Sequence, residues 1–493
     1  MDFDADAAYQ ALAARDARFD GRLFVGVTST GIYCRPICRV RTPQRRNCRF
    51  FETPAQAEAA AFRPCLKCRP EIAPGAGLPW SVMDASRTLA RQAALALNAQ
   101  AASGEAASLA ALAAKLGVSD RHLRRIFSAD QGVTPMQYLQ TRRLLLAKQL
   151  LTDSTMPVAQ VALASGFRSL RRFNAAFAEQ YRMSPTRLRG AADDAALHDA
   201  DTVDAVTLTL AYRAPFDQTA LLRFVAQRAI PGIEEVDATT IRRTLRAGAL
   251  APEGGWLEAR FDPSRDRVQL RFAPALAPAS ARVVAAARRW LDLDAAPAHI
   301  DAALADLPGG PGIRLPGSVD GFELAVRAVL GQQVTVAAAR TLARRVVERF
   351  GEPLATPWPT LARQFPQPAV LASAALSDIA SLGIVRQRAQ ALIALATAWP
   401  ELDALMAPGA SPDGFIAALC ELPGIGPWTA HYIAMRAFGW PDAFPPNDVA
   451  VLKAMKQLFG TPHQRAADER AQAWRPWRAY AVLRLWNSLE TTR

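Results

Sequence analysis

Apolar and polar positions alternate with two different periods in the second half of the chain. Residues 206–214, 256–262 and 267–273 alternate apolar and polar side chains, which is typical of half-buried strands, and a stretch of helical spacing lies between the first two. From about residue 311 onward the apolar positions recur at helical spacing, with short Pro and Gly interruptions and no convincing strand. This pattern predicts an α+β subdomain at 205–305 and an all-α unit at 311–493.

Two linkers divide the first half of the chain. The segment RPEIAPGAGLPW at 69–80 is rich in Pro and Gly, and GAADDAALHDADTVD at 190–204 is small and acidic. They leave a small α+β module at 1–75 and an all-α segment at 81–190. A chain of 493 residues is also too long for one core, so we expect a multidomain, mainly α protein.

The excess positive charge lies entirely in the first half. The net charge is +13; residues 1–80 carry +4, residues 81–190 carry +9, and residues 191–493 carry none. Such a distribution is expected where the first half binds a polyanion, although a merely solvated basic surface would give the same charge. The N-terminus is acidic and no run of 18 uncharged apolar residues occurs, so we expect a cytoplasmic, nucleoid-associated protein that makes no use of a membrane.

Four of the six cysteines form two close pairs. Cys34 and Cys38 are spaced C-x3-C, Cys65 and Cys68 are spaced C-x2-C, and 26 residues separate the pairs, while Cys48 fits neither. Clustered cysteines of a reducing compartment bind metal more often than they form disulfides, and this spacing predicts one tetrahedral zinc site. The zinc could serve only to stabilise a module too small to fold alone.

A thiolate of such a site could also react. Four thiolates on one zinc carry a net charge of −2, which keeps a sulfur deprotonated and nucleophilic. The surrounding sequence is rich in arginine, as expected where a phosphate backbone approaches. These arginines are Arg35, Arg39, Arg41, Arg45, Arg46, Arg49 and Arg63.

The run TGIYCRPICRVR followed by FRPCLKC resembles the methylphosphotriester acceptor domain of Ada-type proteins, over about residues 5–75. The resemblance implies that Cys34 accepts the methyl group and that the three remaining paired cysteines complete the zinc site. It also implies contacts with the DNA backbone from Thr30, Arg41 and Arg63. Methylation would change the site from −2 to −1; one charge at about 6 Å with an effective dielectric constant of about 20 corresponds to at most about 3 kcal/mol. Half of that tightens DNA binding about tenfold.

Two A-x3-G motifs lie 49 residues apart, at Ala113/Gly117 and Ala162/Gly166. Alanine lets two helices approach and glycine supplies the positive φ of the turn, as helix-turn-helix units require. The segment resembles the AraC-type DNA-binding domain, including its ending GFRS…RRFNAAF…YRMSPTRLR. An ordinary helical domain with a basic face is the alternative. Candidates for contact with phosphates and bases are Arg121, His122, Arg124 and Arg125 in one helix, and Arg168, Arg171, Arg172 and Asn174 in the other.

Two neighbouring motifs, LPGIGPWTAHYI at 422–433 and FPPNDVAVLKAM at 444–455, stand out in the last part. Gly424 and Gly426 predict a tight turn whose amides, with the following helix N-terminus, can hold a DNA phosphate. The same turn could simply join two helices. Asp448 begins an apolar helix, where the common use of aspartate is as an N-cap.

From about residue 206 to RPWRAYAVLRLW the chain resembles the helix-hairpin-helix DNA glycosylases of the AlkA type, which release 3-methyladenine. The resemblance implies that Asp448 is the catalytic carboxylate, stabilising an oxocarbenium-like sugar after the base is flipped out. It implies an aromatic pocket that stacks on cationic methylated purines, formed by Trp428, Tyr432 and Trp486. It also implies DNA contacts from Gln333, in place of an apolar wedge, and from Gly424, Gly426 and Thr429.

Several positions narrow the expected reaction. Trp428 stands where strand-cutting relatives carry a Schiff-base lysine, so we expect a monofunctional glycosylase. No cysteine follows Cys420, so we expect no iron–sulfur cluster. Asn447 and Val449 replace an Asp and a Tyr of the AlkA type, which leaves the range of substrates open.

Together these features predict a protein of the adaptive response to DNA alkylation. It would transfer methyl groups irreversibly to Cys34, activate transcription once methylated, and excise alkylated bases by hydrolysis. Its partners would be double-stranded DNA, both alkylated and operator, and RNA polymerase. The rival reading is a transcription factor with a structural zinc module and a non-catalytic, glycosylase-like DNA-binding domain.

Overall fold

The computed structural model describes residues 4–75, 85–101, 108–154, 156–193, 205–406, 410, 412–460 and 463–490. The chain separates into two compact units, one made of Met1–Arg213 with Pro263–Ala285 and the other of Ala214–Asp262 with Ala286–Arg493. The division passes through the predicted α+β subdomain. None of the described helices is both long and apolar enough to cross a membrane.

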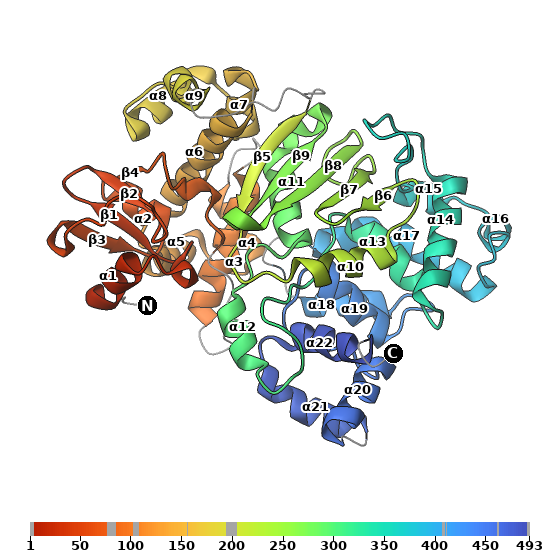
Figure 1. Cartoon of the computed structure of the whole chain (residues 1–493). Coiled ribbons are helices and arrows are strands. Elements are labelled where there is room, and N and C mark those ends of the chain that lie inside the picture. The colour runs from red at the N-terminus through yellow and green to blue at the C-terminus, as the bar shows by residue number, and fades with distance from the viewer. Residues whose placement is uncertain are drawn as a thin grey trace. The chain divides into compact units, whose positions relative to one another are not determined.

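The N-terminal module of the first unit is a four-stranded sheet with small helices (Figure 1). Its strands are β1 (Phe24–Val27), β2 (Ile32–Cys34), β3 (Cys48–Phe51) and β4 (Arg63–Pro64), in the order β3-β1-β2-β4. The helical elements are α1 (Ala5–Ala13), η1 (Ala17–Phe19), η2 (Arg45–Asn47), α2 (Pro54–Ala59) and η3 (Pro70–Ile72). Strand β1 pairs antiparallel with β2 and β3, and β2 pairs in parallel with β4. The buried apolar clusters of this module are small, as expected of a domain that needs a metal to fold.

The following segment is all helical, as predicted. It consists of α3 (Ala85–Gln100), α4 (Leu109–Lys115), α5 (Asp120–Gln131), α6 (Pro135–Asp153), α7 (Val158–Ala164), α8 (Leu170–Tyr181) and α9 (Pro185–Asp193). Gly117 and Gly166 have φ of +70° and +79°, which confirms the turns predicted between α4 and α5 and between α7 and α8. Ser119 and Ser169 cap the helices that follow these turns.

Strands of the predicted α+β segment occur in both units. In the first, β5 (Val206–Ala211) pairs antiparallel with β9 (Arg267–Phe272), flanked by η4 (Pro263–Arg265) and η5 (Pro274–Ala279). In the second, β7 (Thr240–Leu245) pairs with β6 (Glu234–Val236) and β8 (Gly255–Asp262). The sequence pattern missed β6 and β7, because β7 carries Arg243, which is 2% exposed and buried through ion pairs with Glu234 and Glu323.

The rest of the second unit is helical (Figure 1). Its helices include α10 (Gln218–Arg228), α12 (Pro297–Ala303), α13 (Gly321–Leu330), α14 (Val336–Phe350), α15 (Pro368–Ala372), α16 (Leu376–Ala380), α17 (Arg386–Leu405), α18 (Pro412–Cys420), α19 (Pro427–Ala437), α20 (Val449–Phe459), α21 (Gln464–Ala471), η6 (Gln472–Trp474) and α22 (Arg478–Glu490); α11 (Ser280–Trp290) enters it. One large apolar core joins α13, α14, α17, α18 and α19, and a second joins α20 and α22.

Candidate functional sites

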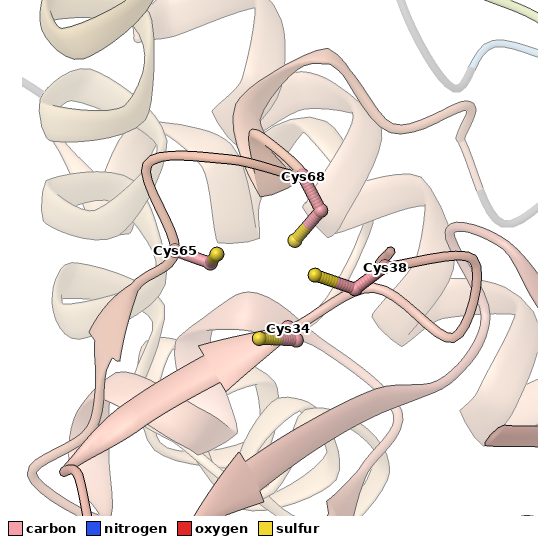
Figure 2. Close-up of side chains that lie close together, drawn as sticks. All are labelled: Cys34, Cys38, Cys65 and Cys68. Atoms are coloured by element: carbon pink, nitrogen blue, oxygen red, sulfur yellow. The ribbon is translucent and has the colours of Figure 1, made fainter. Parts of the chain in front are cut away.

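Two of the four predicted metal ligands lie at the ends of neighbouring strands. Cys34 is the last residue of β2, and Cys65 directly follows β4. Because β2 and β4 run in parallel, with Tyr33 opposite Pro64, both strands end at the same edge of the sheet. Cys38 and Cys68 return to this edge through short turns (Figure 2).

The four sulfur atoms converge on one point, as Figure 2 shows. All four Sγ atoms lie within 4.8 Å of one another. Zinc held by four thiolates at about 2.3 Å places sulfurs about 3.8 Å apart at tetrahedral corners, so the arrangement fits one zinc ion. Cys48 lies outside this group, with its Sγ 3.4 Å from the Gln44 carbonyl oxygen, as a plain buried thiol.

The closeness of the thiols separates their pKa values. Hydrogen bonding with Cys34 lowers the pKa of Cys38 to about 7, while the bond with Cys38 raises the pKa of Cys34. Hydrogen bonding with Cys34 also lowers the pKa of Cys65 and raises that of Cys68. Four sulfurs this close can all carry negative charge only around a cation. Four thiolates are a donor set that would hold zinc.

Arg35 corrects one expectation from the sequence. The sequence predicts that Arg35 faces a phosphate backbone, but it is 4% exposed and its guanidinium forms two hydrogen bonds with the buried Asp20 carboxylate. Its backbone N–H donates to Cys68 Sγ at 3.3 Å and its Nη1 donates to the Cys68 carbonyl oxygen at 3.0 Å. Arg35 therefore holds the ligand loops together from inside the module.

The remaining basic residues near the cluster lie closer to solvent. Thr30 and Arg41, two of the three residues predicted to contact the DNA backbone, are exposed, and Arg63 is half-buried. Arg39, Arg46 and Arg49 are also exposed. Their contact with DNA stays a prediction.

A buried polar bridge joins the zinc module to α6, and sequence reasoning missed it. The Glu58 carboxylate, on α2, accepts from the Tyr33 hydroxyl at 3.1 Å and from the Thr141 hydroxyl of α6 at 2.9 Å. Burial raises the pKa of Glu58 to about 8. Tyr33 directly precedes Cys34, so this bridge begins one residue from the metal site.

A second set of contacts joins the same parts. Lys148, on α6, lies 2.5 Å from the Glu71 carboxylate, and both side chains are almost completely buried, at 2% and 0% exposure. Arg69 forms ion pairs with Glu71 at 3.0 Å and with Asp153, at the end of α6, at 2.5 Å. Asp153 in turn accepts from the backbone N–H of Thr209 in β5 at 3.1 Å. Apart from Arg69 and Glu71, the partners lie far from one another in sequence, so no local pattern could have indicated the contacts with α6 and β5.

The candidate DNA-reading side chains lie on the outer sides of α5 and α8 or just before α8. Most are exposed, and His122 is half-buried. Arg124 pairs with Asp120 at 3.1 Å, and the Arg125 guanidinium lies 3.3 Å from a ring nitrogen of His122. The exposed members are Arg121, Arg124, Arg125, Arg168, Arg171, Arg172 and Asn174. Which of them read bases stays a prediction.

Asp448 lies at the start of α20, as predicted, and has two kinds of partner. Its Oδ1 accepts from the Val451 backbone N–H at 2.8 Å, so Asp448 does cap the helix. Its Oδ2 accepts from Trp428 Nε1 at 2.8 Å, and Oδ1 also accepts from Trp486 Nε1 at 3.2 Å. The carboxylate is 5% exposed, so two indoles and one amide hold it rigidly at the edge of the aromatic group.

The three predicted pocket aromatics lie together. The rings of Trp428 and Tyr432 are parallel, with centroids 5.4 Å apart and an interplanar angle of 6°. Trp486 lies 6.3 Å from Tyr432 at 44°. The side chains of Trp428 and Trp486 are only partly buried, so this group forms an accessible apolar wall beside a carboxylate.

The predicted hairpin joins α18 to α19. Gly424 has φ of +80°, and a side chain there would also press on Ala391, since an added Cβ would lie 3.0 Å from its Cβ. Gly424 and Gly426 are exposed, as a phosphate contact requires. Thr429, also predicted to contact DNA, is 3% exposed and its hydroxyl accepts from Gln332 Nε2 at 3.1 Å. Gln332 donates to the Gly424 carbonyl oxygen as well, at 2.9 Å.

The positions that depart from the AlkA type lie at the surface. Gln333 is exposed in the turn after α13, with φ of +54°, where a side chain could project toward DNA. Asn447 is exposed with φ of +56°, and Val449 is 81% exposed beside Asp448.

Sequence reasoning missed Arg436, one helical turn after Tyr432 on α19. Its Nη1 donates to the Tyr432 hydroxyl at 2.9 Å. The spacing of four residues on a helix was the only signal that could have indicated this contact.

Four protein families match consecutive parts of the chain. They are described as the metal binding domain of Ada, at residues 7–71, a helix-turn-helix domain, at 112–191, the AlkA N-terminal domain, at 207–320, and the HhH-GPD superfamily of base excision DNA repair proteins, at 326–479.

Individual relatives match the whole chain or its parts. The probable bifunctional transcriptional activator/DNA repair enzyme AlkA of Mycobacterium tuberculosis is 37% identical, over 99% of this chain and 97% of its own length. DNA-3-methyladenine glycosylase 2 of Escherichia coli is 36% identical, over 56% of this chain and 96% of its own length. The Ada protein of E. coli is 32% identical, over 33% of this chain and 42% of its own length. Among solved structures, the 3-methyladenine DNA glycosylase of Archaeoglobus fulgidus aligns over 56% of this chain and 96% of its own with a TM-score of 0.48, at 20% identity.

Proposed function

The chain belongs to the family of bifunctional transcriptional activators and DNA repair enzymes that includes the AlkA protein of M. tuberculosis, and we propose how its parts divide that work. It is a DNA-binding protein that accepts methyl groups from damaged DNA, activates transcription and excises alkylated bases such as 3-methyladenine. We assign methyl transfer to residues 1–75, operator binding to 81–190 and base excision to 205–493.

Methyl transfer uses Cys34 as the nucleophile. Its sulfur attacks the methyl carbon of a DNA methylphosphotriester; the carbon–oxygen bond breaks, and its electron pair stays on the phosphate as a normal diester. The convergence of four sulfurs within 4.8 Å carries this assignment, because it supplies the anionic cluster that the reaction needs. Zinc, when bound, keeps these thiols deprotonated at neutral pH.

Activation follows from the change of charge. The thioether formed at Cys34 carries no charge, so the cluster loses one negative charge beside the phosphate backbone and the protein binds DNA more tightly. A sulfur–carbon bond of this kind does not reverse readily, so each molecule reports one lesion. RNA polymerase is the partner that we assign to the methylated form, at the nucleoid in the cytoplasm.

Base excision uses Asp448. As the bond between sugar and base breaks, positive charge develops on the sugar, and a fixed carboxylate stabilises it while water attacks. The observation that supports this role is that two indole N–H groups hold one buried carboxylate beside a partly buried aromatic wall. A helix cap alone needs neither indole. Trp428 cannot form a Schiff base, so the product is an intact strand with an abasic site.

One experiment tests both activities. The purified protein, with its zinc content measured, is incubated with methylated double-stranded DNA. Intact and peptide masses are then determined, and abasic sites are counted in the same sample. We expect one zinc, one added methyl group on Cys34 and abasic sites without strand cleavage.

Cys34→Ser should abolish the label, whereas Cys48→Ser, at a buried thiol outside the cluster, should leave it unchanged. A label on Cys48 or Cys420 contradicts the acceptor assignment. Methyl uptake without abasic sites supports the rival reading, a transcription factor whose glycosylase-like domain only binds DNA. Iron in the purified protein would contradict our expectation that no iron–sulfur cluster is present.

A further inference from the structure

Arg436 lies behind the aromatic wall of the base pocket. Its Nη1 donates to the Tyr432 hydroxyl at 2.9 Å, and its guanidinium carbon lies 5.7 Å from the centre of the Tyr432 ring. Two backbone carbonyls fix its direction: Nε donates to Pro316 at 2.8 Å and Nη2 donates to Gly317 at 3.3 Å. Arg436 is therefore a cation held in one place beside the pocket.

The charges around Arg436 do not cancel. A cavity of about 20 Å³ adjoins it, and the charged side chains that line this cavity are Arg228, Arg243, Arg327, Arg436, Glu234 and Glu323. Each glutamate forms ion pairs with Arg243 and Arg327, at 2.5–2.9 Å. These four groups neutralise one another, whereas the hydrogen bonds of Arg436 given above go to carbonyl and hydroxyl oxygens, so its positive charge remains beside the pocket.

The positive charge extends toward the pocket. Two guanidinium groups lie near the Phe224 ring: the carbon of Arg228 is 3.7 Å from the ring centre, and that of Arg436 is 4.9 Å from it. Burial would raise the pKa of Tyr432, yet the nearby Arg436 and Arg228 lower it below its usual value. Tyr432 in turn stacks on Trp428, whose indole donates to Asp448. One aromatic wall thus has an anion at one end and cations behind the other.

This polarity matches the direction in which electrons move during base release. When the glycosidic bond breaks, both of its electrons go to the base nitrogen and the sugar becomes positive. Asp448 stabilises the sugar, and a fixed cation on the base side stabilises the electron pair on the departing base. A methylated, cationic purine leaves as a neutral molecule, whereas a neutral damaged purine must leave as an anion or be protonated.

We propose that Arg436 is a specificity-determining residue that shifts the balance of excision from cationic toward neutral damaged purines. The proposal rests on the base-excision activity proposed above. For a neutral base, Arg436 meets growing negative charge only in the transition state and lowers the barrier. For a cationic base, it still repels the positive charge that remains on the base in the transition state, so it lowers kcat/KM.

The test compares two substrates that differ in charge. Duplexes carry one 7-methylguanine, which is cationic, or one hypoxanthine, which is neutral, and kcat and KM are measured for each. At a separation of about 8 Å and an effective dielectric constant of about 20, the interaction of one cation with a full charge on the base changes kcat/KM by a factor of about 30. A half-developed charge on the base changes it about fivefold. Arg436→Met should therefore lower kcat/KM on hypoxanthine about fivefold and raise it a few-fold on 7-methylguanine.

Two matched variants separate charge from structure. Arg436→Lys keeps the charge and loses the fixed set of hydrogen bonds, and it should retain most of the wild-type ratio between the substrates. Tyr432→Phe removes the hydroxyl and keeps the cation, and it should retain the ratio too. A merely structural role of Arg436 would lower activity on both substrates alike, with a fall in Tm, and this result overturns the proposal.

The outcomes also distinguish this inference from the function on which it rests. Release of 7-methylguanine but not of hypoxanthine by the wild-type protein overturns the role of Arg436 and leaves base excision intact. Release of neither base, together with no release of 3-methyladenine, overturns base excision itself. An unchanged ratio in Arg436→Met contradicts the inference alone.

Discussion

The zinc-binding cluster and the Asp448 pocket solve opposite electrostatic problems. The cluster draws four like-charged groups from the short stretch between Cys34 and Cys68, with small apolar cores around it. Asp448 is a single anion held by neutral N–H donors from α19, α20 and α22, each packed into one of two large cores. The first arrangement needs a cation to exist, whereas the second is set by packing. The two sites should therefore respond differently to the same treatment.

Removing the metal should have the largest effect, and only on the cluster. Structural zinc in small domains contributes about 10–16 kcal/mol at neutral pH, so chelation should unfold the N-terminal module and abolish methyl uptake. Nine of the ten tryptophans follow residue 255, so Trp fluorescence reports the glycosylase part. Fluorescence and base release should survive chelation. Loss of base release at the same chelator concentration would contradict the independence of the two sites.

Asp448→Asn should have the converse effect. Loss of such a charge commonly raises a barrier by several kcal/mol, so base release should fall at least a hundredfold while DNA binding and methyl uptake persist. Asn caps a helix as well as Asp does, so stability should change little. Single-turnover release of 3-methyladenine and gel-shift binding measure the two quantities. Asn447→Asp, a substitution at the exposed neighbouring residue, is the matched control. Full activity in Asp448→Asn would show that Asp448 only caps the helix.

Breaking the ion pair between Glu71 of the zinc module and Lys148 of α6 should lower the free energy of unfolding by less than removal of the metal does. In Lys148→Met, the Glu71 carboxylate stays buried and keeps only Arg69, and loss of one partner of a buried ion pair costs about 3–5 kcal/mol. We expect the low end of this range in thermal unfolding followed by far-UV circular dichroism. Adding Glu71→Gln to the same chain should restore part of the loss. No recovery in the double variant would mean that packing around Lys148, and not its charge, stabilises the contact.

A half-buried carboxylate that no indole holds, that of Asp292, extends the comparison to pH dependence. Burial raises the pKa of Asp292 to about 6, from 3.8, although it accepts from the Tyr480 hydroxyl and the Leu315 N–H at 2.9 Å each. Because the folded pKa is the higher one, its stabilising contribution is complete below about pH 4 and is lost as pH rises through 6. Asp292→Asn removes this titration, and Asn suits the φ of +51° at this position. Relative to wild type, the variant should gain about 3 kcal/mol of unfolding free energy between pH 3 and pH 7.

The smallest effect should be that of methylation on operator binding. Loss of one negative charge at the cluster should raise affinity about tenfold, or about 1.4 kcal/mol. Titrations of both forms at two salt concentrations measure it, since phosphate contacts make affinity strongly salt-dependent. Equal affinity of both forms at both salt concentrations would leave a repair protein whose methylation does not regulate.

Local sequence determined the parts of this protein whose geometry depends on neighbours along the chain. The pairs C-x3-C and C-x2-C predicted a cluster that the parallel strands β2 and β4 bring together. Gly117 and Gly166 predicted turns that require positive φ. Asp448 was placed at a helix start by pattern, and its role in catalysis was indicated only by resemblance to a family. Each of these depends on backbone conformation or spacing over a few residues.

Tertiary structure alone decided where buried charges lie. The sequence predicts a phosphate contact for Arg35, no strand around Arg243 and no role for Arg436, yet all three have acidic or aromatic partners. A charged side chain can leave water only where its partner already stands, and here that partner lies from 4 to 80 residues away. Residue type and period therefore cannot tell a solvated arginine from a buried one, because the difference depends on the packing of distant segments.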